Sequence, residues 1–263
     1  MTSLSNSYPV NFGFRAGDKG THTSRTMMLE ELGVMLAAVP PDGDRAAYLY
    51  AATEENVLGK PTAATRKLSI QRLSELYAFD PLCLLFRILR RLWENGDSDR
   101  PLLALLCAMA RDPILRATSE PVLAMAVGEE LSRQRMTDAV RGAVGDRLND
   151  STVDKVVRNA SSSWAQSGLL QGRTRKFRQP IRAGAAAATY ALVLAYLQGL
   201  RGSSLFNTPW TRVLCCSPSQ MRDLAADGKR HGYLDMKIAG DIIDVSFSVL
   251  LTNNEILESR VTH

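Results

Sequence analysis

The chain has 263 residues, 45% of them apolar and 22% charged, which is the composition of a globular protein and excludes disorder as its dominant state. That length suits one large domain or two modest ones. A net charge of +5 favours an anionic partner only weakly, so the position of the basic residues matters more than their number. The four cysteines form no Cys-x-x-Cys pair and no signal peptide is evident, so we expect free thiols and a cytoplasmic protein.

The first half of the chain predicts an arm followed by a helical bundle. Residues 1–24 are rich in Ser, Thr, Asn and Gly, and we expect a flexible N-terminal arm. Residues 25–135 carry frequent helix start and stop signals and no strand pattern. Helices are expected at 27–39, at 42–53, from Pro61, from Asp80-Pro81, from Asp112-Pro113 and from Ser119 to Leu131. In the Asp-Pro pairs the Asp caps the first turn and Pro is tolerated just inside it.

The middle segment, 136–182, predicts a helix-turn-wing unit. Ser151 and Asp154 have the spacing of a capping box, and the helix they open is expected to reach about Ser167 and to stop at Gly168. A short apolar step follows, and then a basic stretch from Gln171 to Pro180 that Gly and Pro interrupt. This pattern is typical of a recognition helix followed by a wing, with Trp164 in the core.

The basic residues are concentrated in the same segment. From 155 to 182 there are seven Lys or Arg residues and no acid, a local charge of +7 in a chain whose net charge is +5. Such localisation is the footprint of a phosphate-binding surface, although charge runs are often only solvated loops. The residues expected to contact nucleic acid are Lys155, Arg158, Asn159, Arg173, Arg175, Lys176, Arg178 and Arg182.

Two further basic clusters precede this segment. A possible secondary patch consists of Lys60, Arg66, Lys67 and Arg72, and a third cluster consists of Arg87, Arg90 and Arg91. A solvated helix face is the default interpretation of both, and a continuation of the nucleic-acid track is the alternative.

The C-terminal segment, 183–263, predicts a helical module that ends in a β-hairpin. Residues 183–200 lack charge and approach the length of a membrane span, but the stretch is Ala-rich, which favours a buried helix that starts at Pro180. Another helix is expected from Ser217-Pro218. Alternating residues in 233–238 and 242–249, around Ala239-Gly240-Asp241, predict a hairpin, and this unit is a possible second winged helix. The fold class is therefore mainly α.

The sequence offers no catalytic motif. It contains no phosphate-binding glycine loop, no nucleophile elbow and no His or Cys cluster, so we expect no enzyme activity, no metal and no cofactor. The triplet Asp235-Met236-Lys237, with Asp244 across the hairpin, has the form of part of a metal-dependent nuclease site. Triplets this short occur often by chance.

Two blocks of sequence resemble the BrxA family, accessory proteins of the BREX bacteriophage-defence systems. The first runs from Glu54 to Thr65 (EENVLGKPTAAT) and is followed by Arg72-Leu73. The second is Ser151-Thr152-Val153-Asp154-Lys155 leading to Ala165–Leu170, with the basic stretch behind it. The resemblance covers roughly residues 12–182. It implies a DNA-binding accessory subunit that works beside other BREX subunits.

Three functions therefore compete. Duplex-DNA binding by a non-enzymatic accessory subunit is the leading hypothesis. A protein-interaction scaffold whose basic segment meets an acidic partner is the second. RNA binding is the third, and only Phe177 offers an aromatic ring near the basic run for stacking on single strands.

Overall fold

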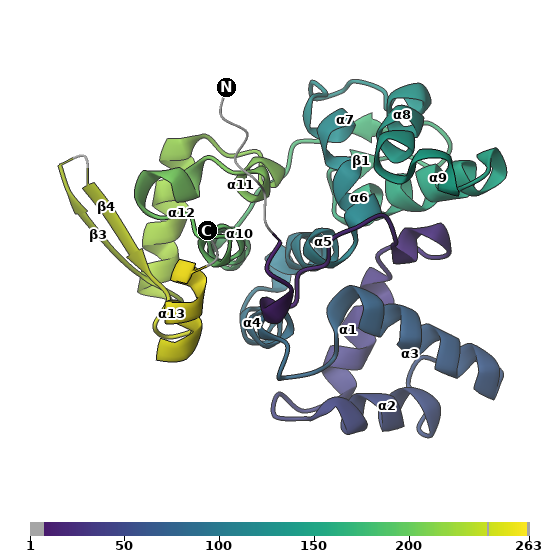
Figure 1. Ribbon diagram of the computed structural model, residues 1–263, viewed down its shortest axis with the longest axis horizontal. Coiled ribbons are helices and arrows are strands. Elements are labelled where there is room, and N and C mark those ends of the chain that lie inside the picture. Colours follow the sequence, from purple (N-terminus) through teal and green to yellow (C-terminus); the bar gives the residue numbers. More distant parts are fainter. Residues whose placement is uncertain (1–7, 241, 262–263) are drawn as a thin grey trace.

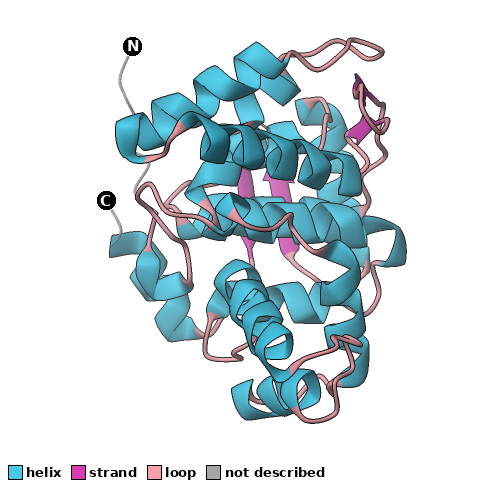
Figure 2. Cartoon of the chain, turned by 90° about the vertical axis from the view of Figure 1, so that its right-hand side faces the viewer, coloured by secondary structure: helices cyan, strands magenta, loops and turns pink. Residues whose placement is uncertain are grey.

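Helices make up most of the computed structural model, which describes residues 8–240 and 242–261 (Figure 1). Strands of the described chain form two short antiparallel hairpins (Figure 2). The predicted mainly α fold is confirmed.

Five helices build the N-terminal part. Their bounds are α1 Leu29–Ala38, α2 Arg45–Thr53, α3 Ala63–Tyr77, α4 Leu84–Trp93 and α5 Arg100–Arg111. The α3 helix begins where Pro61 predicts, because Thr62 and Thr65 form a reciprocal capping box. The expected start at Pro81 is wrong: Asp80 accepts a hydrogen bond from the Leu82 N–H in a turn, and α4 begins only after Cys83.

The α5 helix lies at the centre of the molecule (Figure 1). Every side chain from Leu102 to Ala110 is buried, and the helix packs against α1, α3, α4 and α10. A helix that is apolar on all sides must be enclosed by other elements, and the helices of the bundle therefore pack around α5.

The segment that precedes α1 is packed against the bundle. Phe12, Phe14 and His22 are all buried, and the Arg15 N–H donates to the Ala110 carbonyl at 3.1 Å. The prediction of a flexible arm is therefore wrong for residues 8–24, and residues 1–7 lie outside the described chain. Composition alone misled here, because two aromatic rings and one His outweigh the polar residues around them.

Residues 113–178 contain four helices and the first hairpin. Their bounds are α6 Pro113–Ala117, α7 Ser119–Leu123, α8 Arg133–Val144, α9 Asp150–Gln166, β1 Leu170–Gln171 and β2 Phe177–Arg178. Asp112 caps α6 as predicted, through the Ile114 and Leu115 N–H groups. The helix expected from Ser119 to Leu131 is shorter: it ends at Leu123, and from Gly128, which has a positive φ, the chain extends beside β2.

The C-terminal segment surrounds a second buried helix. Its elements are α10 Ala185–Leu197, α11 Pro209–Val213, α12 Pro218–Arg230, β3 Asp235–Ala239, β4 Ile242–Ser246 and α13 Asn253–Val261. Pro180 does not start α10. Instead the carboxylate of Asp99 accepts hydrogen bonds from the Gly184 and Ala187 N–H groups, at 2.6 and 2.9 Å, and caps the helix from a distant part of the chain. No helix of the described chain is long and apolar enough to cross a bilayer.

The second hairpin agrees with its prediction. Asp235 pairs with Ser246 and Ala239 with Ile242, while Asp241 in the turn lies outside the described residues. The hairpin follows α12 and packs against it, so this segment has the expected order of helices and hairpin.

Candidate nucleic-acid interface

In the segment from α6 to β2, a short hairpin follows four helices and pairs with the chain that precedes α8. The stretch 128–131, between α7 and α8, lies beside β2: the Leu131 N–H donates to the Lys176 carbonyl at 2.8 Å, and the Arg178 N–H donates to the Glu129 carbonyl at 2.9 Å. Since β2 also pairs with β1, it lies between β1 and the stretch 128–131, which joins it through an isolated bridge from Glu130 to Phe177. These contacts hold the hairpin against the chain that leads into α8.

The N-terminal half of α9 exposes one face, with Asp154, Lys155 and Arg158, and buries Val153, Val156 and Val157 on the other. Asn149 caps its N-terminus by accepting the Thr152 N–H at 2.9 Å, so the Ser151–Asp154 capping box predicted for this end is wrong. Towards its C-terminal end α9 packs into the core, where the Trp164 Nε1–H donates to Thr118 Oγ1 at 2.9 Å. The exposed face of this N-terminal half corresponds to the part that a recognition helix presents to a groove of DNA.

The wing loop, residues 172–176, has a defined conformation. Gly172 has a φ of +124°, and a Cβ atom there would lie 2.0 Å from the Arg175 carbonyl oxygen. Lys176 Nζ donates to the Gly172 and Arg173 carbonyls at 3.0 and 3.3 Å. The loop therefore presents its cations from a fixed turn rather than from a mobile tip.

A groove of about 440 Å³ lies between α9 and the wing, and we call it the wing groove. One wall is Val157, Arg158, Ser161 and Ser162 of α9, and the other is Glu130 to Arg133 with Arg173 to Lys176. Its charged side chains are the cations Arg133, Arg158, Arg173, Arg175 and Lys176 and the single carboxylate Glu130.

Two of these cations are already paired. Arg133 Nη2 lies 2.8 Å from Asp154 Oδ1. Arg175 meets Glu130 through two hydrogen bonds, one of them from Nε to Oε1 at 2.8 Å, and lies over the Phe177 ring. The hydrogen bond from Arg175 lowers the pKa of Glu130 and raises that of Arg175, so the pair stays charged. Glu130 thus holds the Arg175 guanidinium within the wing groove.

Arg158 and Arg173 are exposed on opposite walls of the groove, and neither makes an ion pair within the described chain. Lys155, one turn before Arg158, is exposed beside the groove, and Arg182 is exposed in the loop after the wing. The structure therefore gathers Arg158, Arg173, Arg175 and Lys176 around one groove and leaves Lys155 and Arg182 outside its lining.

Arg178 and Asn159, which were expected to contact nucleic acid, make contacts within the protein instead, and the prediction is corrected for both. Arg178 is only 4% exposed, and its guanidinium donates to the Leu169 and Gln179 carbonyls at 3.1 and 2.7 Å. Asn159 Nδ2 donates to the His22 carbonyl at 2.8 Å, on the side of α9 that holds the N-terminal segment. Neighbouring residues of a strand point to opposite faces, and neighbouring residues of a helix also point in different directions. Charge alone therefore does not predict which of them are exposed.

Sequence reasoning missed Arg133 and Glu130. Glu130 lies before α8 and Arg133 is the first residue of α8, both about forty residues from the wing in sequence, and only the pairing of 128–131 with β2 brings them to the groove. No local pattern marks either residue.

The possible secondary patch does not form a shared free surface. Lys60 lies 3.2 Å from Glu31, Arg66 donates to the Lys60 and Thr53 carbonyls, and Arg72 pairs with Glu75 at 2.9 Å. Lys67 alone stays exposed without an ion pair in the described chain. These contacts close the turn between α2 and α3, so the Glu54–Thr65 block has a structural task.

The third basic cluster holds the C-terminal helix. Arg87 Nη2 lies 2.7 Å from both carboxylate oxygens of Glu255, and Arg91 donates to the Val249 carbonyl at 2.6 Å. Arg90 donates to the Val39 carbonyl at 3.1 Å. None of the three is available as a track for nucleic acid without breaking these contacts.

A Ser-His-Asp cluster is buried between the N-terminal segment and α9. His22 Nδ1 lies 2.8 Å from Asp112 Oδ2, and His22 Nε2 lies 2.8 Å from Ser163 Oγ. Their exposed fractions are 0%, 1% and 0%, and Ser163 Oγ also accepts the Met27 N–H at 2.8 Å. No substrate can reach this serine, so the cluster fastens 20–27 to α6 and α9.

The nuclease-like triplet is also engaged in local contacts. Asp235 pairs with Lys229 at 2.8 Å, and Lys237 faces Asp244 across the hairpin. The described residues contain no group of three or more His, Cys, Asp or Glu that could hold a metal ion.

Fold and groove together define a mainly helical protein with a cationic wing-like hairpin. No family model, curated protein or solved structure matches the chain.

Proposed function

We propose that the chain binds duplex DNA through the wing groove and acts as a non-enzymatic, cytoplasmic accessory subunit of a BREX phage-defence system. The observation that carries the DNA part is the groove itself, in which five cations and one carboxylate line the space between α9 and the first hairpin. The BREX part rests on the sequence blocks that resemble the BrxA family.

In this proposal the exposed face of the N-terminal half of α9 enters the major groove and the wing loop follows the adjacent backbone. Arg158 and Arg173 make the first phosphate contacts, since neither has to leave a carboxylate. Lys176 adds charge while holding the loop. Most of the affinity then comes from counterion release and depends strongly on salt.

The test is duplex affinity across a salt series for the native chain and for the double variant Arg158→Ala/Arg173→Ala. Both side chains are exposed, so folding should not change. We expect the slope of log affinity against log salt to fall by about 1.8 in magnitude, about 0.9 for each lost phosphate contact. The matched control is Arg222→Ala/Lys237→Ala, which removes the same charge from α12 and β3.

Equal slopes for the two double variants would show that total charge, and not the wing groove, governs binding, and would refute the proposal. Competition with single-stranded DNA and with RNA identifies the preferred nucleic acid. Stronger displacement by RNA than by duplex DNA would replace the DNA proposal with the RNA one.

A further inference from the structure

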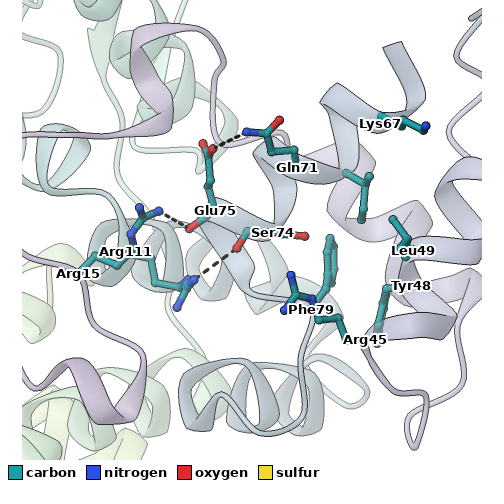
Figure 3. A pocket seen from close by; sticks show the side chains of 11 residues that line it. Arg15, Arg45, Tyr48, Leu49, Lys67, Gln71, Ser74, Glu75, Phe79 and Arg111 are labelled. Atoms are coloured by element: carbon teal, nitrogen blue, oxygen red, sulfur yellow. Dashed lines mark hydrogen bonds between the residues drawn. The ribbon is translucent and has the colours of Figure 1, made fainter. Parts of the chain in front are cut away.

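A second cavity, remote from the wing groove, lies between α2 and α3. It has a volume of about 470 Å³, within the range of ligand pockets, and we call it the α2–α3 groove. Its walls include Arg45, Tyr48 and Leu49 of α2 and Lys67, Ile70 and Gln71 of α3. Figure 3 shows Lys67 at one end and Arg15 and Arg111 at the other.

The base of the groove consists of two aromatic rings that are themselves buried, each 1% exposed. The rings of Tyr48 and Phe79 stack with centroids 4.7 Å apart and an interplanar angle of 14°. Phe79 and the preceding Ala78 both have positive φ, at 51° and 70°, which is rare for residues with side chains. Strained backbone of this kind persists where the surroundings hold it firmly, and it is concentrated at binding sites.

The groove is also strongly cationic. Arg45 and Lys67 are exposed and make no ion pair within the described chain. At the other end, Arg15 donates to the Glu75 carbonyl and Arg111 to the Ser74 carbonyl, each at 3.3 Å, so no carboxylate neutralises these guanidiniums.

The single acid of the groove is already occupied. Both carboxylate oxygens of Glu75 accept from Arg72 at 2.9 Å, and Thr21 Oγ1 donates to one of them at 2.8 Å. Arg45 and Lys67 therefore face solvent without a compensating charge, and the half-buried Arg15 and Arg111 add two cations at the other end. This combination suits a ligand that carries both carboxylates and an apolar side chain.

The dimensions favour a peptide. Residues 67 to 75 of α3 rise about 12 Å along the groove, which matches about four residues of extended chain. Duplex DNA fits poorly, because its bases are stacked inside the helix and cannot cover an apolar surface. Leu49, on the rim, is 52% exposed and adds apolar surface for a polypeptide.

We propose that the α2–α3 groove binds a short acidic segment of a partner protein, with one apolar side chain against the exposed Leu49 and carboxylates on Arg45 and Lys67. This site is separate from the wing groove and does not depend on DNA binding. The chain would then hold a protein partner on one face and nucleic acid on another.

The test uses fluorescein-labelled peptides in which one Leu or Phe is flanked on each side by three Glu residues, and the same peptides with Gln in place of Glu. Anisotropy is measured with the native chain, with Arg45→Ala/Lys67→Ala, with Leu49→Asp, and with the wing variant Arg158→Ala/Arg173→Ala. We expect the Glu peptides to bind the native chain and the wing variant with a dissociation constant of about 10–100 µM.

Both groove variants should weaken this binding by about tenfold, and the Gln peptides should bind more weakly than the Glu peptides. Dissociation constants above about 1 mM for both Glu peptides, or equal binding by native chain and groove variants, would overturn the proposal. Displacement of the peptide from the wing variant by single-stranded or duplex DNA would assign the groove to nucleic acid instead. Neither result bears on the wing groove, whose salt slope is measured separately.

Discussion

Replacement of Glu130 by Gln should make the chain bind duplex DNA more tightly. Glu130 is the single carboxylate among the charged groups of the wing groove, and it holds Arg175 through two hydrogen bonds. A Gln side chain keeps nearly the same shape and one carbonyl acceptor but removes the negative charge. Arg175 then becomes available to a phosphate, while the wing loop keeps its Gly172 turn and its Lys176 contacts.

The size of the effect follows from counterion release. One additional phosphate contact steepens the slope of log affinity against log salt by about 0.9. The corresponding upper limits on the gain in affinity are about fifteenfold at 50 mM salt, about eightfold at 100 mM and about fourfold at 200 mM. Part of each gain is lost in ordering the Arg175 side chain, so we expect roughly threefold to eightfold at 100 mM.

The assay is anisotropy of a labelled duplex titrated at each salt concentration. The matched control is Glu129→Gln, which makes the same charge change one residue earlier. Glu129 pairs with Arg135 at 3.5 Å and does not line the wing groove. Equal gains for the two variants, or a gain that does not shrink as salt rises, would refute the reasoning, because then Arg175 would not be the group released.

Three further results are expected. Arg178→Met should lower the free energy of unfolding by about 2 kcal/mol, because the Gln179 carbonyl loses its donor, and should leave duplex affinity unchanged; a large loss of affinity without loss of stability would return Arg178 to the interface. Burial raises the pKa of Asp112, but the charge and hydrogen bonds of its partners outweigh this and hold the pKa below its ordinary value. Its stabilisation is therefore complete above the unfolded pKa of about 4 and is lost as pH falls through the lower folded pKa. Asp112→Asn should cost about 3 kcal/mol in urea unfolding at neutral pH, and the difference from the native chain should shrink below about pH 4; a constant difference would contradict a charged Asp112. Gly172→Ala should distort the wing and weaken duplex binding, whereas Gly142→Ala, at an open helical position, should leave binding intact; equal effects would show that the Gly172 turn is unimportant.

Interactions between residues close in sequence were sufficient to predict most helices and the second hairpin. The Thr62 cap, the Asp112-Pro113 start and the Gly168 stop act within one or two turns of the chain, so the sequence alone determined them. The same holds for β3 and β4, whose residues alternate around a short turn. The helix starts predicted at Pro81 and Pro180 were wrong. Asp80 forms a turn in place of the first start, and Asp99, distant in sequence, caps the helix that was predicted to begin at Pro180.

The candidate interface was likewise determined partly by the sequence and partly by the tertiary structure. The sequence determined that a helix and a basic wing adjoin and that seven cations lie there without an acid. Only the tertiary structure decided which of them face the groove: pairing of β2 with 128–131 turns Arg178 inward and brings in Glu130, which precedes α8, and Arg133, the first residue of α8. Charge is a property of the residue, but exposure depends on neighbours far away in the chain. For that reason the sequence predicted the charge of the surface, and the fold alone determined which residues line it and which residues they contact.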